Sequence, residues 1–250
     1  MKGMSGYWLL LLIPAVLYLL GRYLIWLPSR NSRWPRLLML HRVTPDVPAS
    51  GMNMPPHRFE KMLRVLQAKS YHFVTVSEML DMDSAEGCLA LTFDDGFADN
   101  YQHAYPLLKK YGIKATIYLA PDIEGIDKLS SEQIREMSES GLVEFGAHTL
   151  HHVNLTTLGE EDAVKEITAS KQRVTELAGS CRSFAYPFGR FSAEHEAMVR
   201  DAGYDSAVST RKKIEQIGKE NRFRLPRIST NGVMDGMQLR IALAKGRYRI

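Results

Sequence analysis

The sequence predicts an α/β protein whose parallel strands, covered by helices, form a closed or nearly closed barrel. Short apolar runs alternate with amphipathic segments from residue 37 to residue 210, several of these runs end on polar residues, and the chain has no internal repeat. Repeated βα units build parallel sheets with the helices outside. With 250 residues, 45% of them hydrophobic, the chain can bury one sizeable core.

Each predicted strand is a short apolar run. These runs cover residues 37–43, 72–76, 88–93, 114–120, 142–148, 181–187 and 205–210. Apolar residues at helical spacing predict helices over residues 57–70, 101–112, 131–141, 160–179 and 192–203, with a helical turn at 77–80. Ser77 is the expected N-cap of that turn, and Gly112 and Gly141 are expected to end two of the helices.

The N-terminal segment differs from the rest of the chain. It is apolar from Gly6 to Leu27 except for Arg22, and about 20 apolar residues cross a bilayer core. Arg22 lies near one end, where its side chain can extend to the interface. No small-residue cleavage pattern follows, so residues 1–30 are predicted to be an uncleaved, single-pass membrane anchor. A buried core helix is the alternative.

The basic residues near this segment bear on orientation and on binding partners. The first forty residues contain no acid and five basic residues, Lys2, Arg22, Arg30, Arg33 and Arg36. The four arginines outnumber Lys2, which favours the cytoplasm for the domain that follows. Removing these five from the 32 basic residues leaves 27 against 28 acids. The charge therefore does not predict nucleic-acid binding.

The chain has two cysteines, Cys88 and Cys181, and both lie in apolar runs. They supply neither a disulfide framework nor a Cys-x-x-Cys metal motif. Both are predicted to be buried thiols.

Polar residues follow four of the predicted strands. Asp94 and Asp95 end one strand, His148 ends another, His41 ends the first, and the sequence Ala-Tyr-Pro-Phe-Gly at 185–189 follows a fourth. In parallel α/β folds, chemistry gathers at the carboxyl ends of the strands. An aspartate pair alone would be read as a turn, but four polar sites at four strand ends predict an active site.

Two of these strand ends together predict a metal site. His148 and His152 are four residues apart, which on a helical turn places both imidazoles on one face. One carboxylate and two imidazoles suit Zn²⁺ with an open position. The ion would neutralise one aspartate of the Asp94–Asp95 pair, and the other would be free to take a proton from water. His151 is an alternative to His152, because a spacing of three also shares a face.

Three motifs then resemble those of the polysaccharide deacetylases, the NodB-homology domains of carbohydrate esterase family 4. They are "TFDDG", "HTLHH" and "FAYPFG", in the order and spacing of the family, and the resemblance covers Leu37 to the C-terminus. It implies a distorted (β/α)7 barrel at residues 37–250, here preceded by the transmembrane helix. It also implies metal-dependent hydrolysis of N- or O-acetyl groups on sugars, and a catalytic domain outside the cytoplasm, against the charge bias.

Carried over by position, the resemblance assigns roles to single residues. Asp94 resembles the catalytic base, and the backbone N–H of Phe188, after Pro187, resembles an oxyanion-hole donor. The implied metal ligands are Asp95, His148 and His152, for Zn²⁺ or another divalent transition metal.

Two departures from the family pattern concern the base partner and the general acid. The arginine that many members place before the proline of the third motif is Ala185 here. Arg227 is the candidate partner of Asp94, with Arg182 and Arg190 as alternatives. The C-terminal Leu-x-His motif is also missing, and "LMLHRV" instead resembles the N-terminal strand of the circularly permuted poly-N-acetylglucosamine deacetylases. His41 is then the candidate acid, with a structural core histidine as the alternative.

These residues predict an enzyme that removes N-acetyl or related acyl groups from a polysaccharide or a lipid-linked sugar at a membrane. A catalytically inactive barrel that binds glycan or acts as a scaffold is the alternative. The candidate base and all three candidate ligands are present, and a degenerate copy would be expected to have lost one.

Overall fold

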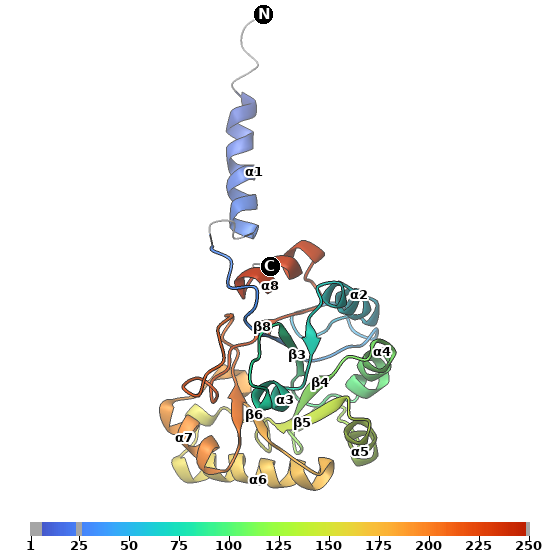
Figure 1. Ribbon diagram of the computed structural model, residues 1–250, viewed down its shortest axis with the longest axis vertical. Coiled ribbons are helices and arrows are strands. Elements are labelled where there is room, and N and C mark those ends of the chain that lie inside the picture. The colour runs from blue at the N-terminus through green and yellow to red at the C-terminus, as the bar shows by residue number, and fades with distance from the viewer. Residues whose placement is uncertain (1–6, 24–26, 249–250) are drawn as a thin grey trace, which may run out of the picture.

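The computed structural model describes residues 7–23 and 27–248, and its centre is a sheet of parallel strands (Figure 1). Every strand pairing in this sheet is parallel. The strands are β1 (Arg36–Leu40), β2 (His72–Phe73), β3 (Cys88–Phe93), β4 (Ala115–Leu119), β5 (Val143–Ala147), β6 (Ser183–Ala185), β7 (Ser206–Val208) and β8 (Ile228–Ser229). The predicted α/β class with a parallel sheet is confirmed.

The strand order shows how the sheet curves toward closure. The order is β7-β6-β5-β4-β3-β1-β8, and β2 pairs with β3 beside this path. Leu225 forms an isolated parallel bridge with Val208 of β7, and three residues later Ile228 pairs with Leu38 of β1. One short segment therefore links the two ends of the strand path.

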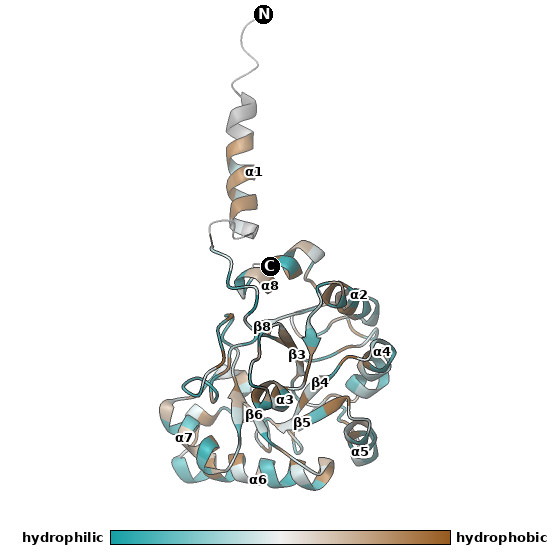
Figure 2. Cartoon of the chain, in the orientation of Figure 1, coloured by the Kyte–Doolittle hydropathy of each residue, from teal (hydrophilic) through white to brown (hydrophobic). Residues whose placement is uncertain are grey.

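Helices surround the sheet, and most of them follow a strand directly (Figure 1). They are α2 (Pro56–Gln67), α3 (Val76–Asp81), α4 (Tyr105–Tyr111), α5 (Ser131–Glu139), α6 (Glu160–Ala178), α7 (Ala193–Asp201) and α8 (Gly236–Lys245). The remaining helix, α1 (Tyr7–Tyr23), precedes β1 and projects away from the sheet (Figure 1). Figure 2 shows hydrophobic residues on the central strands and many hydrophilic residues on outer helices such as α6. This is the pattern of a sheet buried on both faces, where strands read as continuous apolar runs.

Most predicted elements are present, with shorter bounds. The turn at 77–80 is the start of α3, but its N-cap is Thr75 rather than Ser77. The Thr75 hydroxyl accepts the Glu78 N–H, and the Glu78 carboxylate accepts the Thr75 N–H. Ser77 is buried, and its hydroxyl instead donates to Glu144 on β5. Cys88 and Cys181 are buried free thiols, as predicted.

The predicted membrane anchor is wrong. Across residues 7–23 and 27–248, the structure contains no helix with the length and apolar character needed to span a bilayer. The helix α1 has 17 residues, and at about 1.5 Å per residue it is shorter than a hydrocarbon core of about 30 Å. The predicted apolar segment ran from Gly6 to Leu27, but Gly6 and residues 24–26 lie outside the described residues.

Candidate active site

The carboxyl ends of β1 and β3 lie side by side and bring two candidate residues together. Leu40 pairs with Phe93, and the Asp94 N–H donates to the Leu40 carbonyl at 3.0 Å. His41 and Asp94 therefore leave adjacent strands at the same edge of the barrel. His148 follows β5 at this same edge, as parallel strands require.

Asp94 forms a bidentate ion pair with Arg227. The two guanidinium NH groups lie 2.6 Å from Oδ1 and 2.7 Å from Oδ2 of Asp94. Arg227 is fully buried and Asp94 is 2% exposed. Arg227 also donates to Thr92 Oγ1 on β3 at 2.9 Å and to the Ser209 carbonyl, just after β7, at 3.1 Å, so both sides of the barrel hold the guanidinium in place.

This pairing decides the protonation state of Asp94. Burial by itself would raise the pKa of the Asp94 carboxyl, but the charge and the hydrogen bonds of Arg227 hold it well below its ordinary value. Asp94 is therefore an ionised carboxylate throughout the neutral range.

The other two arginines considered as partners of Asp94 lie elsewhere. Arg182 forms ion pairs with Asp81 and Asp205, and Arg190 is exposed. Arg227 is thus the arginine that contacts Asp94.

A change of backbone conformation separates the two adjacent aspartates. Asp94 keeps a backbone hydrogen bond to β1, whereas Asp95 has φ 74° and Gly96 has φ 76°. A Cβ at position 96 would lie 2.6 Å from Leu119 Cδ2, so the turn needs glycine there. The chain turns away after Asp94, and Asp94 contacts Arg227 while Asp95 contacts histidines.

The loop after β5 brings two imidazoles to Asp95. His148 Nε2 lies 3.6 Å and His152 Nε2 3.3 Å from Asp95 Oδ1, and the two ring centroids are 4.8 Å apart. The helical turn expected for this segment is wrong: residues 148–152 are irregular, with positive φ at Thr149 and His152. The left-handed backbone at Thr149 and His152, rather than helical periodicity, brings the imidazoles of His148 and His152 together.

Hydrogen bonding and burial prepare His148 as a neutral ligand. Its Nδ1 lies 2.7 Å from the Ala185 carbonyl, which can only accept, so Nδ1 carries the hydrogen and Nε2 keeps its lone pair. Burial lowers the pKa of His148 to about 3 and also lowers that of His152.

His151 points to a different partner. Its Nδ1 lies 2.7 Å from Glu166 on α6, and the same carboxylate accepts the N–H groups of Leu150 and His151. The loop is therefore tied to α6 through Glu166, which sequence reasoning missed. The cluster at Asp95 contains His152 and not His151.

The residues around Asp95 fit a divalent metal ion. Ligand atoms of Asp95, His148 and His152 lie within 4.8 Å of one another. Asp95 Oδ1 is buried and has no hydrogen-bond partner, and both imidazole Nε2 atoms face it. Ligands about 2.0–2.1 Å from a tetrahedral zinc ion are about 3.3 Å apart, close to the two separations seen here. A carboxylate oxygen facing two nitrogen lone pairs is unfavourable unless a cation lies between them.

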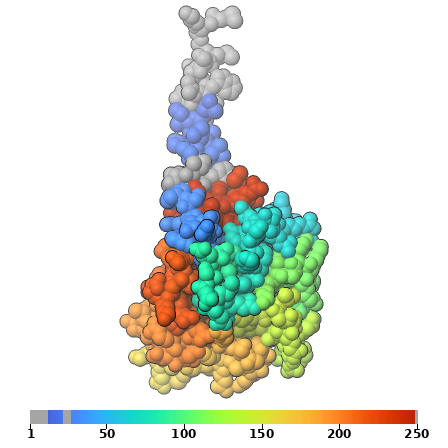
Figure 3. Space-filling view, in the orientation of Figure 1, coloured from blue at the N-terminus to red at the C-terminus, as the bar shows by residue number. Residues whose placement is uncertain are grey.

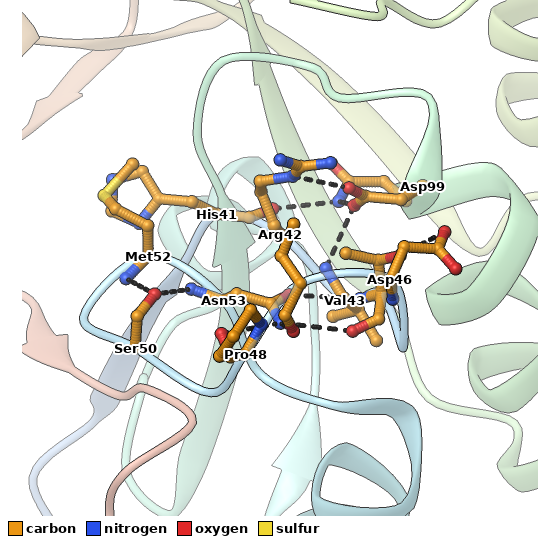
Figure 4. A network of polar contacts seen from close by, with 12 residues as sticks. His41, Arg42, Val43, Asp46, Pro48, Ser50, Met52, Asn53 and Asp99 are labelled. Atoms are coloured by element: carbon orange, nitrogen blue, oxygen red, sulfur yellow. Dashed lines mark hydrogen bonds and ion pairs between the residues drawn. The ribbon is translucent and has the colours of Figure 1, made fainter.

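The segment that follows His41 is held by a polar network that sequence reasoning also missed. Asp99 accepts the Val43 N–H at 3.0 Å and Arg42 Nε at 2.8 Å, and Asn100 Nδ2 donates to the His41 carbonyl at 2.9 Å (Figure 4). Asp99 and Asn100 are both buried. Their position in the sequence, a few residues after the double-aspartate motif, was the available signal.

Phe188 lies at the rim of the cluster. Its φ is 59°, its side chain is 57% exposed, and its ring centroid is 4.7 Å from that of His152. The left-handed conformation places residue 188 in a tight turn directly after β6, beside the candidate metal ligands.

The fold and this candidate metal cluster fit a hydrolase, and comparison with known proteins identifies the family. Residues 81–207 match the model of the polysaccharide deacetylase family. The chain is 32% identical over 192 residues to "Putative polysaccharide deacetylase YxkH" of Bacillus subtilis, with 74% of this chain and 67% of the relative covered. The chain belongs to the polysaccharide deacetylase family, which confirms the predicted enzyme class.

Two further similarities support this assignment. "Poly-beta-1,6-N-acetyl-D-glucosamine N-deacetylase" of Staphylococcus aureus is 27% identical over 190 residues, and the match spans 68% of this chain and 65% of the relative. The solved structure of IcaB from Ammonifex degensii is 25% identical with a TM-score of 0.73, over 84% of this chain and 97% of that chain. The chain thus spans about two thirds of the length of the Bacillus subtilis and Staphylococcus aureus relatives.

The fold itself has another close counterpart. The Streptococcus pyogenes deacetylase PplD, solved in complex with acetate, has a TM-score of 0.75 and 24% identity over 85% of this chain and 98% of that chain. This likeness concerns the fold.

We expect metal binding at Asp95 to weaken in acid. Burial, and secondarily Asp94, raises the pKa of the Asp95 carboxyl to about 6. Below that pH a proton occupies the carboxylate and must leave before an ion binds, so apparent zinc affinity should fall about tenfold per pH unit below 6 and be level above it. Competition titration with a chromophoric chelator between about pH 5 and pH 7.5 measures this.

The matched variant is Asp95→Asn. It should bind zinc weakly at every pH and lose the dependence below pH 6, because the titrating ligand has been removed. A wild-type affinity that does not change between these pH values would contradict the assignment of Asp95 as a ligand.

Proposed function

We propose that the protein is a metal-dependent deacetylase that removes N-acetyl groups from a polysaccharide of the poly-N-acetylglucosamine class. The observation that carries the proposal is the cluster of Asp95, His148 and His152 beside the Arg227-bound carboxylate of Asp94. Similarity to the Staphylococcus aureus enzyme supports the substrate class. Lipid-linked N-acetylated sugars are a second substrate group to test.

The proposed chemistry divides among this chain's own residues. A divalent ion held by the three ligands would supply Lewis-acid activation of the acyl carbonyl and of water. Asp94 accepts the proton of the attacking water, and Arg227 keeps Asp94 ionised and oriented. The Phe188 N–H donates to the oxygen that becomes negative, as an oxyanion-hole group does. His41 donates a proton to the leaving amine.

The low pKa of Asp94 limits its strength as a base but secures its charge. Efficient general bases have pKa values near the working pH, whereas Arg227 holds the pKa of Asp94 far below it. The ion would supply Lewis-acid activation of the water, so a weak base in a fixed position is sufficient. The ion pair therefore contributes orientation more than basicity.

The direct test is hydrolysis of acetylated β-1,6-linked glucosamine oligomers, followed by the release of acetate and of free amines. We expect release with zinc present, loss of release after chelation, and recovery when zinc is restored. The variant Asp95→Ala, His148→Ala is the control and should be inactive in all three conditions. If purified protein with stoichiometric zinc releases no acetate from these oligomers or from lipid-linked sugars, the deacetylase proposal fails and the inactive glycan-binding barrel is favoured.

We expect His41→Ala to slow amide hydrolysis more than ester hydrolysis. Departure of an amine anion is very unfavourable without a proton, whereas an alkoxide leaves more readily, so loss of the acid should affect amides more. Loss of a general acid costs about 10²–10⁴-fold. The measurement is the ratio of amide to ester turnover at equal zinc occupancy, with His57→Ala, exposed on α2, as the control. An unchanged ratio in His41→Ala would make His41 a structural residue.

We propose residues 37–250 as the catalytic domain. Arg36, just before this range, links the start of β1 to α8. The Arg36 guanidinium is buried and donates to the carbonyls of Leu243, Asn31 and Trp34.

A chain lacking residues 1–30 keeps the hydrogen bonds of Arg36 and loses the one from the Arg30 N–H to the Ala244 carbonyl. One hydrogen bond contributes about 1 kcal/mol, so its melting temperature should fall by about 2–4 °C. Loss of cooperative unfolding would show that the N-terminal segment belongs to the core.

A further inference from the structure

A basic pocket lies where the segment preceding β1, the loop after β7 and the end of α8 meet. Its volume is about 320 Å³, and Leu27 and Pro28 form its apolar wall. Six basic residues line the pocket: Arg30, Arg211, Lys212, Lys213, Lys245 and Arg247. It shares no lining residue with the candidate active site.

The three segments are held together by close backbone contacts. The Arg30 N–H donates to the Ala244 carbonyl at 2.8 Å. Gly246 has φ 84°, and a Cβ there would lie 2.8 Å from the backbone of Lys213 and Ile214. The end of α8 therefore packs directly on the loop after β7. Figure 3 shows the blue segment before β1 lying against the red C-terminal region. The fold brings together cations from three separate segments of the chain, so the pocket does not come from a single basic stretch of sequence.

Two of these cations lie beside other side chains outside the pocket lining. Lys213 forms an ion pair with Glu215 at 2.6 Å, and the Arg211 guanidinium lies 5.5 Å from the centre of the Phe191 ring. No acidic residue is among the described residues that line the pocket. The cations gathered around one small space repel one another, and an anion with several charges and oxygens relieves this. Guanidinium groups bind phosphate through paired hydrogen bonds, and lysines act as point charges beside them.

We propose that this pocket binds a phosphate-class anion, such as a phosphate or diphosphate group, independently of the deacetylase site. The group could belong to a soluble phosphorylated molecule or to a lipid headgroup, and the experiment separates these two sources. A single acetate-like carboxylate has fewer oxygens and less charge than the six cations can engage.

The experiment is titration of the full chain with inorganic pyrophosphate at low ionic strength, and sedimentation with phosphatidylcholine vesicles with or without phosphatidylglycerol. The test variant is Arg30→Gln, Lys212→Gln, Arg247→Gln, with one change in each segment. The control is Lys69→Gln, Lys109→Gln, Lys165→Gln, which removes the same charge from exposed lysines outside the pocket.

We expect pyrophosphate affinity to fall at least tenfold in the test variant, to stay within about twofold in the control, and to weaken as salt screens the charges. Binding that is lost only from phosphatidylglycerol vesicles in the test variant would also support the pocket and identify a lipid source. Equal behaviour of the test and control variants in both arms, or no binding by the wild type, would overturn the proposal.

Discussion

Asp94→Asn should abolish most deacetylation while zinc remains bound. The amide cannot accept the proton of the attacking water, and loss of a general base costs about 10²–10⁴-fold in turnover. The proposed metal ligands Asp95, His148 and His152 are untouched by the change, so metal content should stay stoichiometric. Turnover on an acetylated oligomer and zinc content of the same sample are the two measurements.

A matched control comes from a second aspartate that forms a bidentate ion pair with an arginine. Asp81 contacts the two terminal guanidinium NH groups of Arg182 at 2.7 and 2.8 Å, but the pair lies on the surface, with half-exposed side chains. Asp81→Asn should leave turnover unchanged. If Asp94→Asn works within a few-fold of wild type while keeping its zinc, Asp94 is not the base.

Arg227→Met should strongly destabilise the protein at neutral pH. It leaves the Asp94 carboxylate, 2% exposed, without its partner. Removing one member of a buried ion pair costs about 3–5 kcal/mol, because the remaining charge is buried without compensation. Denaturant unfolding at pH 7 measures the loss. The surface counterpart Arg182→Met should cost under about 1 kcal/mol.

The pH dependence of this loss follows from the pKa of Asp94. In the wild type the folded-state pKa lies below the ordinary value, so the pair stabilises the protein above about pH 4 and this stabilisation is lost as pH falls through the folded pKa. Without Arg227, burial raises the pKa of Asp94, and the carboxyl takes up a proton at moderately acidic pH. The difference between wild type and Arg227→Met should therefore shrink as the pH is lowered.

A double variant separates the buried charge from other effects. Arg227→Met combined with Asp94→Asn removes both charges, and it should recover a large part of the stability lost in Arg227→Met without recovering activity. A loss below about 1 kcal/mol in Arg227→Met, or no recovery in the double variant, would show that the pair is not the source of stabilisation.

The sequence alone predicted the parts of the protein that depend on local pattern. Alternating apolar runs and amphipathic segments predicted the parallel α/β fold, because helical and strand periodicity are local properties. The elements missed were β8, with two residues, and α8. A two-residue strand carries no period and exists only because it pairs with β1. The prediction of a membrane anchor from the apolar N-terminal segment was wrong, because its helix has only 17 residues.

The sequence also determined which residue types gather at the strand ends, since strand direction alone puts Asp94, Asp95, His41 and His148 at one edge of the barrel. Only the tertiary structure decided which aspartate pairs with Arg227 and which faces the histidines. Positive φ at Asp95 turns it toward the histidines, while Asp94, directly after β3, still donates its N–H to Leu40 of β1.

Long-range packing decided the remaining partners. Arg227 reaches Asp94 across 133 residues of sequence, and Glu166 on α6 engages His151, which leaves His152 facing Asp95. Contacts between residues so far apart in the chain depend on how helices and strands pack, and no local spacing encodes them.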